Sequence, residues 1–103
     1  MVKFLDLKSD LRTSSEEFVL IDYNIGYSNF KLKDYKNAAF AFRNFLNNNS
    51  LETKLKEDAL IRLGDSYFAL GDYRNAINTY SKVVQNSSSD ADYAEYQLSL
   101  IHI

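Results

Sequence analysis

The chain contains no cysteine, no proline and no tryptophan, and only three glycines among its 103 residues. Without cysteine it can form no disulfide, use no thiolate chemistry and hold no cysteine-ligated metal, although this absence does not fix the compartment. The shortage of proline and glycine leaves few helix breakers, which favours long helices. The composition therefore predicts an α-helical chain.

Catalysis and metal binding have little support. Nucleophilic catalysis usually needs a histidine near a serine, threonine or cysteine, and the one histidine, His102, lies next to the last residue. Glu57, Asp58 and Asp65 contain carboxylates, but Asp58 and Asp65 are two helical turns apart with no ligand between them. We expect no enzyme activity, no catalytic residues, no metal and no cofactor.

Charge and hydropathy argue against two classes of partner. Twelve basic residues against 14 acidic ones give a net charge of −2, whereas domains that bind nucleic acid normally show a basic face. No stretch approaches the roughly 18 apolar residues of a membrane span, and residues 1–6 lack the apolar core of a signal peptide. We expect no nucleic acid and no membrane insertion, and the localisation stays open between the cytoplasm and the cell envelope.

Apolar residues recur at three- and four-residue steps, and alternation with period two is not sustained, which predicts helices and no strands. Asp34 and Asp72 are expected to be N-caps, and runs of asparagine at 47–49 and of serine at 87–89 are expected to be loops. The expected helices cover about residues 2–12, 15–32, 35–48, from 50 or 53 to 70, 73–86 and 90–103.

A duplication runs through the chain. Residues 34–38 (DYKNA) recur 38 residues later as 72–76 (DYRNA), and Phe30 aligns with Phe68 at the same offset. A period of this length indicates stacked helical units. We expect one domain over residues 1–103 in which a preceding helix and a truncated third unit flank two complete units, with the boundaries 1–12, 15–48, 51–86 and 90–103.

Small residues stand where the two helices of a unit are expected to cross. Gly26 and Gly64 are small on the first helix of each unit, and Ala38 and Ala76 are small on the second. Small side chains let helix axes approach closely, while the aromatic residues Phe42 and Tyr80 are expected to fill the space between successive units. These positions therefore indicate how the units stack, and not what they bind.

The two units differ where the first helix ends. Lys33 stands at the position of Gly71, where a helix C-terminus favours a left-handed residue. A lysine in that conformation costs on the order of 1 kcal/mol. We therefore expect Lys33→Gly to raise the melting temperature.

These residues resemble the tetratricopeptide repeat family, from about residue 16 to the end of the chain. The resemblance implies an all-α solenoid of antiparallel helix pairs that winds into a right-handed superhelix. The chain departs from the family in its step of 38 residues instead of about 34, and in asparagine and serine where a proline often closes the unit. The second unit carries the family motif most fully, at Leu63, Gly64, Tyr67, Gly71, Asp72, Tyr73, Ala76 and Tyr80.

The resemblance also implies a protein–protein interaction scaffold or adaptor, in which the first helix of each unit lines a concave groove for a peptide or protein. The best-known groove of the family clamps a C-terminal carboxylate with a cluster of lysine, asparagine and arginine. The residues expected to line the groove in this chain, which are given at the end of this paragraph, do not supply such a cluster. An aromatic groove instead favours an extended or helical apolar segment, unless its rings pack against neighbouring repeats. The residues expected to line the groove are Tyr23, Tyr27, Phe30, Lys31, Ile61, Asp65, Phe68, Tyr96 and Leu100.

Two other functions remain open. The apolar residues of the last segment predict a homodimer through the C-terminal helix, because an array needs end caps for solubility. The chain is also consistent with a regulatory segment of a larger multidomain protein. In style it is similar to bacterial cell-envelope members of the family that assist outer-membrane assembly or the Tol–Pal system. The residues expected at the dimer surface are Leu98, Leu100, Ile101 and Ile103.

Overall fold

A computed structural model describes residues 15–47, 53–86 and 90–101, and within these ranges it contains α-helices and no strand. The observed helices begin within one residue of the expected starts, with Thr53 and not Ser50 as the start of the third. The first four end within two residues of the expected ends, and the expected end of the last helix at residue 103 lies outside the described residues. The helix expected over residues 2–12 lies outside the described residues. The helices are α2 (Ser15–Lys31), α3 (Tyr35–Leu46), α4 (Thr53–Leu70), α5 (Tyr73–Gln85) and α6 (Ala91–Ile101).

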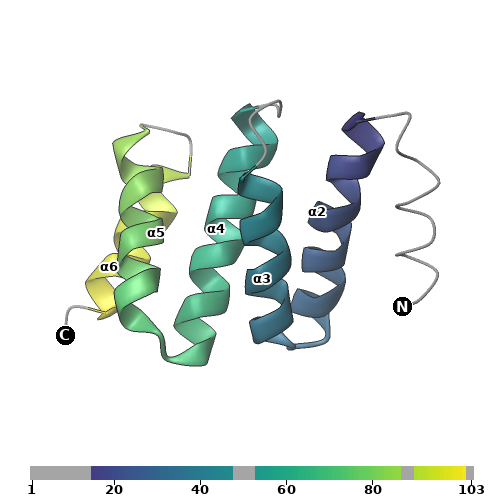
Figure 1. The fold of residues 1–103 in the computed structure, drawn as a ribbon. Helices are drawn as coiled ribbons and strands as arrows, with labels where there is room; N and C mark the ends of the chain where they lie inside the picture. The colour runs from purple at the N-terminus through teal and green to yellow at the C-terminus, as the bar shows by residue number, and fades with distance from the viewer. Residues whose placement is uncertain (1–14, 48–52, 87–89, 102–103) are drawn as a thin grey trace.

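The helices stack in chain order. Each one packs mainly against the next in sequence, and α2 also makes a few contacts with α4. Figure 1 shows α2, α3, α4 and α5 standing side by side in a row, with α6 behind α5. The first helices of the units are α2, α4 and α6, and the second helices are α3 and α5. Each second helix packs against the first helix of its own unit and against the first helix of the next unit.

The second helix of each unit begins at an aspartate. The Asp34 carboxylate accepts a long 3.4 Å hydrogen bond from the backbone N–H of Asn37 and a 2.7 Å bond from its side-chain amide. Asp72 accepts the same pair of bonds from Asn75, at 3.4 and 2.7 Å. Each carboxylate satisfies a backbone donor that has no partner within the helix. Both predicted N-caps are confirmed.

The first helix of each unit ends at a residue in the left-handed region. Lys33 has φ 63° and Gly71 has φ 77°. The N–H of Lys33 donates to the carbonyl of Phe30 at 3.0 Å, and the next N–H, that of Asp34, donates to Asn29 at 2.8 Å. This pair of bonds defines a Schellman motif, which normally uses glycine. The predicted left-handed conformation of Lys33 is confirmed.

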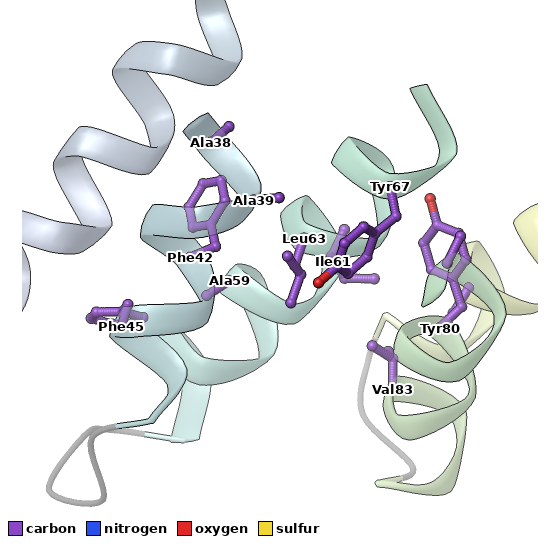
Figure 2. Packing of buried hydrophobic residues seen from close by; sticks show 12 residues of the cluster. Ala38, Ala39, Phe42, Phe45, Ala59, Ile61, Leu63, Tyr67, Tyr80 and Val83 are labelled. Atoms are coloured by element: carbon purple, nitrogen blue, oxygen red, sulfur yellow. The ribbon is translucent and has the colours of Figure 1, made fainter. Parts of the chain in front are cut away.

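Two glycines allow the helices of each unit to approach. A Cβ atom built on Gly26 would lie 2.7 Å from the ring of Phe42, and one built on Gly64 would lie 2.6 Å from the ring of Tyr80. Both rings are fully buried. Figure 2 shows Phe42 on α3 and Tyr80 on α5 among the buried residues of the core cluster. The glycines expected at the helix crossings therefore make room for an aromatic ring in each unit.

Candidate interaction surface

The surface of interest lies on the first helices and is called the first-helix face below. Its members recur at steps of three and four residues along each helix, so they share one side of it. It comprises the nine residues predicted for the groove and four neighbours. The full set is Leu20, Tyr23, Tyr27, Phe30 and Lys31 on α2, Asp58, Ile61, Arg62, Asp65 and Phe68 on α4, and Tyr93, Tyr96 and Leu100 on α6.

A carboxylate on α4 holds two tyrosines of α2. The hydroxyl of Tyr23 donates to Asp58 Oδ2 at 2.6 Å, and the hydroxyl of Tyr27 donates to the same oxygen. The two rings meet edge to face at 5.0 Å, and Tyr27 lies edge-on to Phe42 at 5.4 Å. Burial and the hydrogen bond to Asp58 raise the pKa of both tyrosines above the usual value. Asp58 therefore joins the first unit to the second.

A second carboxylate joins α4 to α5 and α6. Asp65 Oδ1 accepts hydrogen bonds from the hydroxyls of Tyr80, at 2.5 Å, and Tyr93, at 2.8 Å. Asp65 Oδ2 pairs with Arg62 Nη1 at 2.5 Å. Burial and the bond to Asp65 raise the pKa of Tyr93 to about 12. Asp65 is therefore satisfied by donors from its own helix and from both following helices.

The contact of Tyr27 with Asp58 and the contact of Tyr93 with Asp65 join equivalent positions of successive units, but the tyrosine and the aspartate have changed places. Tyr27 and Asp65 occupy the same place in successive units, 38 residues apart, and Asp58 and Tyr93 occupy another, 35 residues apart. In one contact the earlier unit supplies the tyrosine, and in the other it supplies the aspartate. Sequence reasoning missed the roles of Asp58 and Tyr93. Alignment of all three units would have shown tyrosine facing aspartate at both junctions.

Some residues predicted for the groove pack within the array. Ile61 is only 3% exposed and belongs to the core cluster. Phe30 and Phe68 are half-buried, and each meets a tyrosine of the following helix edge to face, at 5.5 and 5.7 Å. The Arg62 guanidinium lies 5.8 Å above the ring of Phe30. These side chains contribute to stacking and offer a partner little surface.

Other predicted residues remain open. Tyr96 is 62% exposed and Leu100 is 40% exposed, both on α6. Lys31 is exposed at the end of α2, and the rings of Tyr23 and Tyr27 are half-buried. The structure thus divides the predicted groove into a satisfied polar centre on α4 and more exposed apolar side chains on α6.

A cleft lies on the opposite side of α4 and is called the outer cleft below. It has a volume of about 800 Å³ and is formed by α3, α4 and α5. On α4 its lining residues include Lys56, Leu60, Leu63 and Tyr67, which lie about half a turn around the helix from Asp58 and Asp65. The outer cleft and the first-helix face are therefore separate surfaces.

No group of three or more histidine, cysteine, aspartate or glutamate residues suited to a metal ion occurs in residues 15–47, 53–86 and 90–101. No helix within the same ranges is long and apolar enough to cross a membrane.

The family model described as the tetratricopeptide repeat matches residues 22–50 and 58–89, which together make up more than half of the chain. The chain belongs to the tetratricopeptide repeat family. Its consecutively packed helices form the all-α solenoid of that family. Searches of curated proteins and of solved structures gave no significant match.

Tetratricopeptide repeats generally mediate protein–protein interaction and typically act as scaffolds without catalysis. This family role agrees with the predicted class of function. The likeness in style to bacterial cell-envelope proteins has no support from the comparisons and stays a prediction.

Proposed function

We propose that this tetratricopeptide array is a non-catalytic scaffold that binds an apolar peptide or protein segment on its first-helix face. The observation that carries this proposal is the exposure of Tyr96 and Leu100 on α6. Large apolar side chains that gather on a surface mark interaction sites more often than isolated ones do. Tyrosine suits such a site because its ring becomes buried while its hydroxyl stays hydrated.

The polar groups of the face indicate which partner chemistry fits. Asp58 and Asp65 already accept hydrogen bonds from tyrosines, and Arg62 is paired with Asp65. The donors of Tyr23 and Tyr27 are directed to Asp58 instead of toward a partner. Recognition would therefore depend on ring and aliphatic surface, which favours an apolar segment in extended or helical form over a charged one.

Self-association is the second candidate. Leu98 and Ile101 pack against the core cluster, so much of the apolar surface of α6 is already used within the chain. A homodimer through α6 would consequently rest on Tyr96 and Leu100, which also belong to the proposed groove, while Ile103 lies outside the described residues. Light scattering at increasing concentration separates the two, because only self-association raises the measured mass without added peptide. A regulatory role within a larger protein stays a prediction.

The proposed function can be tested with peptides selected from a displayed random library and measured by calorimetry. We expect apolar sequences to be selected, and the double variant Tyr96→Ala with Leu100→Ala to weaken their binding by at least about tenfold, or 1.4 kcal/mol. Phe40→Ala is the matched control, because Phe40 is 57% exposed on α3 and does not belong to the face. If the control loses as much affinity as the double variant, or if no peptide is selected, the proposal is wrong.

A further inference from the structure

We propose that the outer cleft is a second binding site, which takes an acidic, extended segment of a protein partner. Its volume of about 800 Å³ lies within the range of roughly 300–1,000 Å³ found for ligand sites. The site does not depend on the first-helix face, because it is lined from the opposite side of α4. The cleft combines positive charge, asparagine amides and an apolar floor.

The charge of the cleft opposes that of the chain. Arg43, Lys56 and Lys82 line it against a single carboxylate, that of Glu57, whereas the whole chain has a net charge of −2. Among the described residues, none of the three cations is paired with a carboxylate. Positive charge without a protein counter-ion attracts an anionic partner and speeds its association.

The position of Lys56 is informative because helix electrostatics do not explain it. Arg43 and Lys82 lie in the last turns of α3 and α5, where a cation is favoured by the negative end of the helix dipole. Lys56 is the fourth residue of α4, near the positive end, and no acidic residue accompanies it in the first turn. The lysine therefore adds to a positive potential that the helix N-terminus already creates.

The antiparallel course of the helices gathers these charges at one end. The end of α3, the start of α4 and the end of α5 meet there, so all three cations share the same end of the cleft. Asn44 and Asn78 stand on the α3 and α5 walls, exposed and without a hydrogen-bond partner among the described residues. An asparagine amide both donates and accepts, as does the backbone of an extended peptide.

The floor distinguishes a peptide from a nucleic acid. Leu60 is half-buried and Leu63 and Tyr67 are buried, and all three line the cleft from α4. Apolar atoms beneath a few polar groups suit side chains of a peptide. A phosphate backbone has no apolar side chains to cover this floor. The acidic side chains of the segment would lie at the cationic end, and its backbone would cross between the asparagines.

The test uses fluorescence anisotropy with a blocked, labelled peptide of alternating glutamate and serine, and a second peptide in which glutamine replaces glutamate. We expect the glutamate peptide to bind more tightly. Lys56→Glu and Lys82→Glu should each weaken it by about tenfold, because an attractive contact becomes a repulsive one. Glu57→Gln should tighten binding, and misfolding cannot produce that gain.

Lys36→Glu is the matched control, since Lys36 is exposed on α3 and does not line the cleft. It should leave the affinity unchanged, as should the double variant Tyr96→Ala with Leu100→Ala, which acts on the other face. The proposal is overturned if the glutamine peptide binds as well, if Lys36→Glu weakens binding as much as Lys82→Glu does, or if single-stranded oligouridine displaces the peptide more readily than unlabelled glutamate peptide does.

Discussion

Replacement of Gly64 by alanine tests the proposed close approach of helices within a unit. The new Cβ would lie 2.6 Å from Cε1 and 2.9 Å from Cδ1 of Tyr80. The Tyr80 ring cannot easily retreat, because it is fully buried and its hydroxyl is bound to Asp65 at 2.5 Å. The added methyl group must therefore displace a ring that is held at both ends.

Two opposing effects set the size of the change. Overpacking a well-filled core costs about 1–3 kcal/mol. Alanine, however, favours the helix over glycine by about 1 kcal/mol. Since the ring is fixed by its hydrogen bond, we place the overpacking cost in the upper part of its range. The net expectation for Gly64→Ala is a loss of about 1–2 kcal/mol of unfolding free energy, obtained from the difference of these terms.

The assay is urea unfolding followed by circular dichroism, with the slope checked for constancy. Ser28→Ala is the control, because Ser28 is exposed on α2 and alanine there raises helix propensity without filling a tight space. In a double-mutant cycle, Gly64→Ala should cost less in a Tyr80→Leu background, because the narrower side chain leaves room for the methyl. A Gly64→Ala protein more stable than the wild type would refute the close approach.

Three further predictions concern the helix ends and the inter-unit contacts. Lys33→Gly should raise the unfolding free energy by about 0.5–1 kcal/mol, because the strain energy that is relieved exceeds the entropic cost of glycine's greater freedom in the unfolded chain. Gly71→Lys should lower the unfolding free energy by a similar amount, and thermal melts of both variants check this. Asp58→Asn should cost about 1–2 kcal/mol through a weaker acceptor, and a double-mutant cycle with Tyr27→Phe should show coupling, whereas additive effects would contradict the contact. Burial and the bond to Asp65 raise the pKa of Tyr93 in the folded protein to about 12, whereas the tyrosine of the unfolded chain ionises near pH 10. The stability that this group contributes is therefore fully present below about pH 10 and should be lost as the pH rises from about 10 to about 12. Urea unfolding across this range should show a shallower loss for Tyr93→Phe, and equal slopes would count against the hydrogen bond from Tyr93 to Asp65.

The sequence predicts well those features that depend on near neighbours. Asp34 and Asp72 act as caps through contacts with a residue three positions ahead. Lys33 is left-handed because the local helix end requires it, and its alignment with Gly71 is enough to indicate this. Such features repeat whenever the local motif repeats.

The sequence predicts poorly those features that depend on how one unit rotates against the next. Asp58 aligns with Leu20 in the first unit, so comparison of the two complete units alone does not mark it as the partner of Tyr27. The pairing becomes visible only when Tyr93 of the third unit is aligned as well. Ile61 was expected to line the groove, yet packing around α4 leaves it 3% exposed. The outer cleft likewise arises from the separation of α3 and α5 across α4 and has no motif of its own.

The most direct measurement of the central proposal is mapping of amide chemical shifts on isotope-labelled protein, with an apolar peptide selected as described above. We predict that the perturbed amides lie on the first helices, around Tyr27 on α2, Asp65 on α4 and Tyr96 on α6. The amides around Asn78 on α5, beside the outer cleft, should change little with this peptide. Perturbations confined to α3 and α5 would contradict a binding site on the first-helix face.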